Sequence, residues 1–446
     1  MKVLLVCTSV EEAQRIDPSD SHYPMGLAYI HAYIKNKHKV KVSYLSNVPQ
    51  KICIDNLKST IRQFKPDIVG ISVMTPSRVS SFELIEYLQT KNIKTVLGGI
   101  HATVMHEQLL KKYPDVIIVL GEGEVTFSEL LDNLDGLDIV KGIAYYDNGV
   151  KLTEPRLLIE DLDALPFPEH GTFLYQGKTL ANLLTSRGCP FKCNFCCLDV
   201  FSKRKVRFRS AENVVDEIEY IEKNYPDIKT IWLHDDTFMI NKKRTIEICN
   251  KIVERKIKLK FVCSARFKPI STEVVEAMER ANFIQVLFGL ESGADKVMKN
   301  MHKGLNKDDV RKAIELFKNS NIKITVFLIV GLPGETTNTI IETGKFVQEL
   351  QKINYFTYRD INIAMVYPGA EIYDMSKQAN ELNDDYWMTD KDIPFYKVEH
   401  DYDKLRKMKD VLLNMVSYTR VDTPIGKFYQ REMIPYINNY FTRFGS

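Results

Sequence analysis

Residues 185–196 read Thr-Ser-Arg-Gly-Cys-Pro-Phe-Lys-Cys-Asn-Phe-Cys, which places Cys189, Cys193 and Cys196 in the spacing C-x3-C-x2-C. The run directly follows an apolar stretch, Leu180–Thr185, that we expect to be a β-strand. Three thiolates on one short loop can each bind one iron of a [4Fe-4S] cubane and leave the fourth iron open. A structural zinc site takes four protein ligands, usually from two C-x2-C pairs, and the sequence has no second pair. The motif therefore predicts that these cysteines bind an iron–sulfur cluster.

Strands and helices alternate through the region around this loop. We expect strands at Leu180–Thr185, Thr230–His234, Phe261–Ser264, Ile284–Phe288, Ile324–Val330 and Asp360–Met365. We expect helices between them at Asn213–Lys223, Arg244–Arg255, Thr272–Ala281, Lys307–Asn319 and Thr337–Lys352. Six β/α units over residues 179–370 predict a partial (β/α)6 TIM-like barrel, with its chemistry at the C-terminal ends of the strands.

A second alternating series precedes the barrel. We expect strands at Val3–Val6, Val40–Leu45, Ile68–Val73, Thr95–Leu97 and Val116–Val119, and helices that include Leu27–Ile34, Phe82–Leu88 and Val104–Leu110. This pattern predicts an α/β fold over residues 1–150, doubly wound and Rossmann-like. It closes in a hairpin around Asp147-Asn148-Gly149. The proline-containing segment 151–178 is predicted to be a linker, and residues 371–446 an aromatic-rich C-terminal extension.

Composition excludes several classes of protein. The chain has 446 residues, 44% of them hydrophobic, and 61 basic against 58 acidic residues give a net charge of +3. This balance gives no reason to expect nucleic acid or an anionic membrane as a partner. The basic run Ser202–Arg209 fits a solvated loop better than a phosphate site. No apolar stretch approaches the roughly 18 residues that span a bilayer. We expect a cytoplasmic protein with reduced thiols.

The motif C-x3-C-x-aromatic-C after the first barrel strand resembles that of the radical S-adenosylmethionine (SAM) enzymes. The resemblance covers roughly residues 180–370. It implies that Cys189, Cys193 and Cys196 hold a [4Fe-4S] cluster whose open iron chelates SAM. An electron from the cluster then cleaves SAM to a 5′-deoxyadenosyl radical. Phe195 occupies the aromatic position that is implied to lie against the adenine.

The resemblance also implies SAM contacts at the ends of later strands. A carboxylate at Glu291 can accept two ribose hydroxyls, or it can favour the dipole of the next helix. A guanidinium at Arg266 suits a carboxylate partner, although a surface arginine is an alternative. The acidic turn at Asp236 either approaches the SAM amine or is solvated. The implied contacts are Asp236, Ser264, Arg266, Glu291, Gly331 and Pro333.

The first domain resembles the cobalamin-binding domain that often precedes a radical SAM barrel. The resemblance rests on Pro24–Tyr29, Gly98–Thr103 and Gly121–Thr126, which all lie at the C-terminal ends of strands. The implied cobalamin contacts are Gly26, Ser72, Gly98, Gly99, His101, Gly121, Glu122 and Gly123. The family's axial-ligand pattern is D-x-H-x-x-G, and here the spacing around His22 is one residue too long. Axial ligation and the retention of cobalamin therefore stay open.

These features predict a cobalamin-dependent radical SAM enzyme. The first expectation is a methyltransferase that acts on an unactivated carbon or a phosphinate through a 5′-deoxyadenosyl radical and methylcobalamin. A cyclase or rearrangement enzyme of the same fold and a non-catalytic iron–sulfur protein stay open. A methylthiotransferase is disfavoured, because the N-terminal domain carries only Cys7 and Cys53 where three cluster cysteines are needed. The expected partners are a small-molecule or natural-product substrate and an electron donor of the flavodoxin or ferredoxin type.

Overall fold

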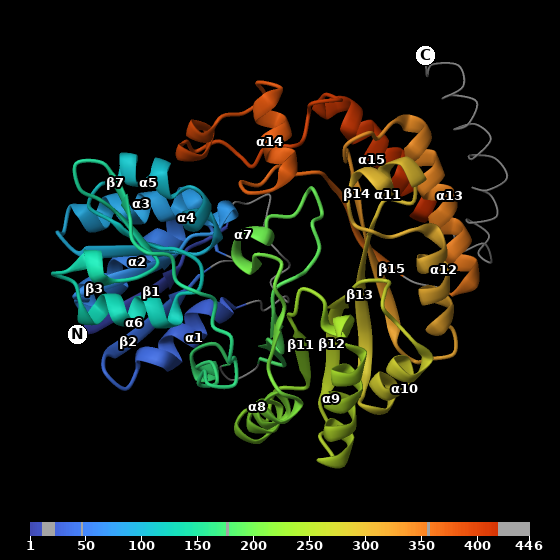
Figure 1. Ribbon diagram of the computed structural model, residues 1–446, viewed down its shortest axis with the longest axis horizontal. Helices are drawn as coiled ribbons and strands as arrows, with labels where there is room; N and C mark the ends of the chain where they lie inside the picture. The colour runs from blue at the N-terminus through green and yellow to red at the C-terminus, as the bar shows by residue number, and fades with distance from the viewer. Residues whose placement is uncertain (11–22, 46–47, 175–177, 355–356, 418–446) are drawn as a thin grey trace.

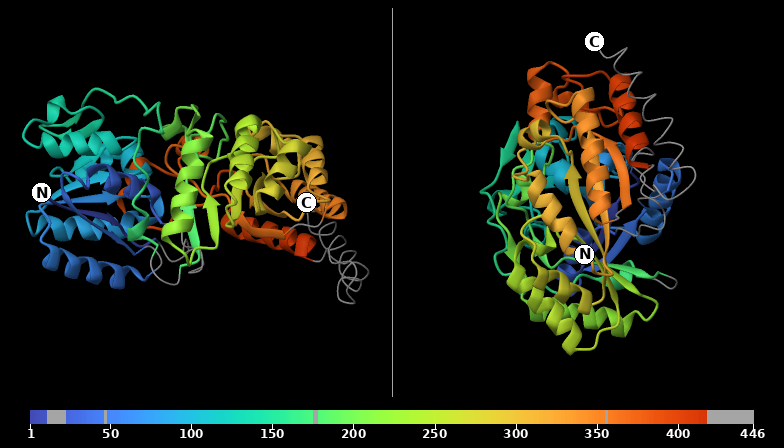
Figure 2. Two further views of the ribbon diagram at one scale, coloured as in Figure 1. Left: turned by 90° about the horizontal axis from the view of Figure 1, so that it is seen from below. Right: turned by 90° about the vertical axis from the view of Figure 1, so that its right-hand side faces the viewer.

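The computed structural model describes residues 1–10, 23–45, 48–174, 178–354 and 357–417. Two largely parallel sheets lie side by side, the N-terminal one in blue and teal and the second in green to orange (Figures 1 and 2). The first sheet has seven strands in the order β2-β1-β3-β4-β5-β6-β7, and the second has six in the order β15-β14-β13-β12-β11-β8. The predicted fold class, a Rossmann-like domain followed by a partial barrel, is confirmed.

The N-terminal sheet is built from short β-branched runs. Its strands are β1 (Lys2–Cys7), β2 (Lys39–Tyr44), β3 (Ile68–Ser72), β4 (Lys94–Gly98), β5 (Ile117–Val119), β6 (Ile143–Tyr146) and β7 (Val150–Leu152). The first five are parallel, and β6 and β7 add an antiparallel hairpin. Because the strand order reverses between β1 and β3, a crevice opens there beyond the carboxyl ends of the strands, where open α/β sheets bind ligands.

Helices cover both faces of this sheet, as the alternation predicts. Helices α1 (Met25–Ile34) and α6 (Glu124–Asp132) pack on one face. The other face carries α2 (Gln50–Phe64), α3 (Arg78–Gln89), α4 (Ile100–Val104) and α5 (His106–Lys112). The single helix expected over Val104–Leu110 is divided in two, because Met105 leaves helical geometry with φ −104° and ψ 25°.

The second sheet is parallel throughout, and its edge strands β8 and β15 do not pair with each other, so the barrel is open. Its strands are β8 (Leu180–Leu183), β11 (Thr230–Leu233), β12 (Lys260–Ala265), β13 (Phe283–Glu291), β14 (Lys323–Val330) and β15 (Thr357–Ile363). Its helices are α7 (Asp199–Ser202), α8 (Ala211–Asn224), α9 (Lys242–Glu254), α10 (Thr272–Arg280), α11 (Asp295–Asn300), α12 (Lys307–Leu316) and α13 (Thr337–Ile353). A two-stranded ribbon, β9 (Ser186–Arg187) with β10 (Arg207–Phe208), brackets the cysteine loop.

The segment after the barrel contacts both domains. Helix α14 (Glu371–Gln378) lies above the junction of the two domains, and α15 (Tyr402–Ser417) packs beside α13 at the far edge (Figure 1). Between them, the buried ring of Trp387 lies 6.1 Å from the His101 ring of the N-terminal domain. The aromatic residues from Phe428 to Phe441 lie outside the described residues. In the part of the chain that is described, no helix combines the length and apolarity needed to cross a membrane.

Candidate active site

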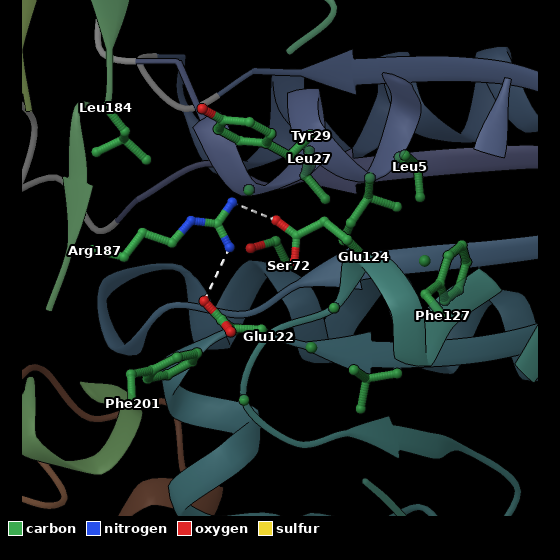
Figure 3. A pocket seen from close by; sticks show the side chains of 18 of the residues that line it. Leu5, Leu27, Tyr29, Ser72, Glu122, Glu124, Phe127, Leu184, Arg187 and Phe201 are labelled. Carbon is green, nitrogen blue, oxygen red and sulfur yellow. Dashed lines mark hydrogen bonds and ion pairs between the residues drawn. The ribbon is translucent and has the colours of Figure 1, made fainter. Parts of the chain in front are cut away.

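A cavity lies between the N-terminal sheet and the first turns of the barrel (Figure 3). Its empty space is about 1120 Å³, counting the open mouth. Seven of the residues predicted to contact cobalamin line it: Gly26, Ser72, Gly98, Gly99, Gly121, Glu122 and Gly123. The barrel side is lined by Leu184, Arg187, Gly188, Leu198, Phe201, Ser202, Arg207 and Asp236. The cavity thus joins the crevice of the first domain to the segment that carries the cysteines.

The glycines of this cavity serve two different purposes. A Cβ atom on Gly99, where φ is +89°, would lie 2.8 Å from the carbonyl oxygen of Val73, so the close approach of two loops requires glycine. A Cβ atom on Gly26 would meet no atom within 4 Å, so this glycine leaves its space to the cavity. The deeper wall is apolar and includes Leu5, Leu27, Ile30, Ile71, Val96, Leu97, Val119 and Phe127. A large, apolar, glycine-lined cavity fits a corrin with its nucleotide tail.

A bulky side chain at Gly26 tests this fit. We expect Gly26→Phe to fold, since the position has free space, and to lose bound cobalamin, because the ring fills the cavity. Gly26→Ala adds only a methyl group and is expected to retain most of it. The measurement is the cobalamin content per chain after desalting, read from the visible spectrum. The fit is contradicted if both variants retain cobalamin equally.

The cysteine loop is held at both ends by contacts with other parts of the chain. Gly188 has φ +98°, and a Cβ atom there would lie 2.1 Å from the carbonyl oxygen of Lys205, so only glycine is possible. The buried Asn194 anchors the other end, because its side-chain amide donates to the carbonyl of Asn300 (2.9 Å) and its carbonyl accepts from Ile372 (3.0 Å). Cys189, Cys193 and Cys196 are half-buried and free of disulfides.

The donor set of this loop fits a cubane. The loop supplies three cysteines, Cys189, Cys193 and Cys196, that are free of disulfides. A [4Fe-4S] cluster takes each thiolate at a separate iron. Burial raises the pKa of the Cys196 thiol to about 12 and also raises that of Cys189. Bound iron offsets this cost, because a coordinated thiol is deprotonated.

Arg266 reaches the cysteine loop from the end of β12. Its Nη1 lies 3.7 Å from the Sγ atom of Cys193, and its Cζ lies 3.5 Å from the ring centroid of Phe191. Its Nη2 donates to the carbonyl of Lys303. The side chain is buried, so the surface-arginine alternative is wrong. Ser264, two residues earlier, and Phe195, in the loop itself, are half-buried.

The two aspartates after β11 have different surroundings. Asp235 is buried and accepts from the backbone N–H of Thr185 and the hydroxyl of Ser186, both at 2.6 Å, so it fixes the chain just before the cysteine loop. Asp236 lines the cavity. Burial, with the negative charge of Asp235 beside it, raises the pKa of Asp236 to about 6. Asp236 is therefore the member of the pair that lines the cavity.

Glu291 ends β13 in a left-handed conformation, with φ +65°, at an irregularity of the sheet. The carboxylate forms a buried ion pair with Lys303, 2.8 Å from Nζ to Oε1. Nζ also donates to the carbonyl of Gly289 at 2.6 Å. Sequence reasoning missed Lys303, which lies in the loop between α11 and α12. The ion pair also requires glycine at position 289, where a Cβ atom would lie 2.6 Å from this ammonium group.

The glycine-rich loop after β14 is covered by the C-terminal segment. A Cβ atom on Gly331, where φ is +89°, would lie 2.7 Å from Leu405 of α15. The Gly331 N–H donates to the carboxyl group of Glu335 at 2.6 Å. The carbonyl of Pro333 accepts from the Asn300 side chain at 3.0 Å. The predicted adenine loop therefore packs on one side against α15.

Glu335 makes stability depend on pH. Burial raises its pKa to about 8, although the backbone N–H groups of Gly331 and Leu332 oppose this. A raised acid pKa means that the folded protein binds the extra proton, so stability falls as pH rises from about 4.5 toward 8, by on the order of 1.4 kcal/mol per pH unit. We expect Glu335→Gln to lose less stability between pH 5.5 and pH 8.5 than the wild type does. The measurement is the thermal unfolding midpoint of both proteins at the two pH values. An unchanged difference between the two pH values would contradict the assignment.

His101 is the one predicted cobalamin contact that does not line the cavity. Its Nδ1 lies 3.2 Å from the hydroxyl of Thr75, and its ring faces Trp387. Burial, with the charge of Arg78 nearby, lowers its pKa to about 3, so the ring is neutral. This placement agrees with a structural role for His101. His22, the other candidate axial ligand, lies outside the described residues.

A buried polar network links the two domains and was not anticipated. The Tyr23 hydroxyl lies 2.8 Å from His170 Nδ1 and donates to the carbonyl of Asn182 at 3.0 Å. His170 Nε2 lies 2.8 Å from one oxygen of Glu217, and Arg209 lies 2.5 Å from the other. These residues come from the start of α1, the linker, β8, α8 and the turn before it. No local pattern relates them.

The fold and the two adjoining sites define a class of enzyme that combines a cobalamin-binding domain with a radical SAM barrel. The radical SAM superfamily model matches residues 183–347, and the B12 binding domain model matches residues 16–131. An uncharacterized methyltransferase of Pyrococcus horikoshii is 30% identical over 413 residues, which cover 90% of this chain and 88% of that protein. The chain therefore belongs to the cobalamin-dependent radical SAM enzymes, whose cofactors are a [4Fe-4S] cluster, SAM and cobalamin.

Two other similar proteins differ in length from this one. The anaerobic magnesium-protoporphyrin IX monomethyl ester cyclase of Rubrivivax gelatinosus is 31% identical over 346 residues, covering 73% of this chain. The solved structure of OxsB, a cobalamin-dependent SAM radical enzyme with aqua-cobalamin and SAM bound, superposes with a TM-score of 0.70 at 20% identity over 86% of this chain. The match spans 62% of the cyclase and 62% of the OxsB chain. The OxsB likeness shows the shared fold.

Proposed function

We propose that this chain is a methyltransferase that acts on an unactivated carbon or a phosphinate of a small molecule. The observation that carries the proposal is the shared cavity, since the glycine-lined crevice opens directly onto Arg187, Gly188 and Asp236 at the base of the cysteine loop. Two cofactor sites that face one space can act on the same substrate. The name of the Pyrococcus relative, a methyltransferase, supports the same choice.

The residues around the cysteine loop have separate proposed roles. Cys189, Cys193 and Cys196 hold the cluster, whose chemistry is the one-electron cleavage of SAM. Asp236 faces the SAM amine. Glu291, held by Lys303, has a second carboxylate oxygen that the ribose hydroxyls can share. The remaining proposed SAM contacts are Phe195, Ser264, Arg266, Gly331 and Pro333.

The crevice has its own proposed roles. Gly26, Gly98, Gly99, Gly121 and Gly123 give cobalamin close access to the backbone, and Ser72 offers a hydroxyl to its tail. The apolar wall excludes water from the space between the cofactors. The electron donor is proposed to be a flavodoxin or ferredoxin.

A cyclase or rearrangement enzyme is the second candidate. The observation that favours it is the 31% identity to the Rubrivivax cyclase, which is close to that of the methyltransferase relative. The same site residues serve both reactions up to SAM cleavage. The candidates differ in whether a SAM methyl group moves.

The test uses the enzyme purified without oxygen, loaded with cobalamin, and incubated with SAM carrying a CD3 group and a strong reductant. We expect 5′-deoxyadenosine, and the CD3 group on the bound cobalamin by mass spectrometry. 5′-Deoxyadenosine without CD3 transfer would reject the methyltransferase and leave the cyclase. Failure to form 5′-deoxyadenosine would reject both candidates.

A further inference from the structure

We propose that Arg187 is a positioning residue that fixes the cysteine loop relative to the cobalamin-binding domain through Glu122 and Glu124. It is the second residue of β9 and precedes Cys189 by two positions. Figure 3 shows its guanidinium group reaching across the cavity between the two carboxylates. The inference rests on the two cofactors and not on which reaction they perform.

The contacts of Arg187 use both ends of its guanidinium group. Nη1 lies 3.0 Å from Glu122, and Nη2 lies 2.6 Å from Glu124. The Tyr29 ring of α1 lies 4.8 Å from Cζ, at a distance suited to a cation–π contact. All three partners belong to the first domain. Because the guanidinium group is planar and binds two separate carboxylates, it fixes both the distance and the orientation of the ribbon relative to the first domain.

Glu122 extends this contact to a second strand of the ribbon. Its other oxygen accepts from Arg207 Nη1 at 2.8 Å and from the backbone N–H of Ile159 in the linker at 2.9 Å. Arg207 pairs with Arg187 across the ribbon. One carboxylate therefore joins the glycine loop of the first domain, the linker and both strands that bracket the cysteines.

The other side of the same ribbon is fixed to the barrel. Ser186 donates to Asp235 at 2.6 Å, and Arg244 Nη2 donates to the carbonyl of Thr185 at 2.6 Å. Adjacent residues thus bind different domains: Ser186 the barrel and Arg187 the cobalamin-binding domain. Because Arg187 and its carboxylates are largely buried, removing the guanidinium takes the ion pair from the buried Glu124 and leaves Glu122 paired with Arg207 alone.

This arrangement explains why two acidic residues stand in a loop proposed to cradle a cofactor. Glu122 and Glu124 flank Gly123 and alternate with Gly121. The glycines leave the backbone accessible from the cavity, and the two carboxylates bind the arginines of the ribbon on the barrel side. A displacement of reacting groups by about 1 Å can lower the reaction rate about 100-fold, so a contact that fixes the separation of the two cofactors affects the rate.

The test compares Arg187→Met with the control Arg255→Met. Arg255 also bridges carboxylates, but it does so on the outer surface of α8 and α9, where it pairs with Glu212, Asp216 and Glu219. Each holoenzyme carries its cluster and cobalamin, both reduced to paramagnetic forms. The readout is the enhancement of cobalt spin relaxation by the cluster, which depends on their separation. We expect Arg187→Met to lose much of the enhancement, Arg187→Lys to restore part of it, and Arg255→Met to match the wild type.

Two further results decide the proposal. Unchanged relaxation enhancement in Arg187→Met, with iron and cobalamin contents equal to wild type, would overturn it. If Arg187→Met fails to hold its cofactors, Glu124→Gln decides, because it removes the 2.6 Å contact and leaves the barrel side intact. Reduced enhancement in Glu124→Gln supports the proposal, and unchanged enhancement overturns it.

Discussion

Replacing Cys193 with alanine is expected to remove the iron–sulfur cluster and lower 5′-deoxyadenosine formation below detection. Cys193 is the middle cysteine of the loop, and Arg266 lies beside its sulfur atom at 3.7 Å. With two thiolates left, the cubane lacks one of its three protein ligands. Iron and sulfide content, measured after anaerobic reconstitution, reports the loss directly. Cobalamin binding is expected to persist, since its cavity is lined mainly by the first domain.

Cys197 provides the matched control for this experiment. It is adjacent to Cys196, half-buried and outside the C-x3-C-x2-C spacing. Cys197→Ala is expected to keep the cluster and the deoxyadenosine product. If the two variants lose iron to the same extent, the assignment of ligands within the loop is incorrect.

Replacing Glu217 with alanine is expected to destabilise the protein by about 3–5 kcal/mol, because it leaves the buried Arg209 charge uncompensated. Glu217 is fully buried between His170 and Arg209. Burial alone would raise its pKa, but Arg209 and His170 outweigh burial and lower it. The stabilisation is therefore present above the ordinary glutamate pKa, near 4.5, and is lost as pH falls through the lowered value. Chemical denaturation at pH 7 measures the main effect.

Glu219, two residues along the same helix, is the control. Its side chain is 55% exposed, and it pairs with Arg255 on the surface. Exposed ion pairs contribute little, so Glu219→Ala should leave the denaturation midpoint almost unchanged. Equal midpoints for the two variants would show that the buried network does not stabilise the fold.

Local patterns were enough to predict the two sheets and the cavity. The strands are short β-branched runs. The predicted glycines of residues 98–99 and 121–123 lie at or just after the C-terminal ends of the parallel strands β4 and β5, whereas Gly26 lies in the first turn of α1. Parallel strands bring such ends to one edge, so Gly98 and Gly121 line the same cavity although they lie at different strands. The cysteine spacing needed no tertiary information at all.

Contacts between distant residues could not be predicted in this way. Tyr23 and His170 are 147 residues apart, and Arg187 is 65 residues from Glu122. Nothing in the periodicity of either segment selects the partner. His101 shows the same limit, because a histidine after a glycine pair suggests a ligand contact, while its environment is set by Trp387 in a segment almost 300 residues later.

The position of Trp387 also restricts how this enzyme can be recombined with its relatives. The tryptophan ring follows the barrel in sequence but covers Arg78 and His101 of the first domain, with the Arg78 Cζ 5.4 Å from the ring. In a chimera that joins this first domain to the barrel of another protein at the linker, Trp387 is lost. The surface around Arg78 and His101 that its indole ring covers would then be exposed. A chimera that keeps this packing must therefore take both the first domain and the segment around Trp387 from the same protein. These two parts of the chain are separated by the whole barrel.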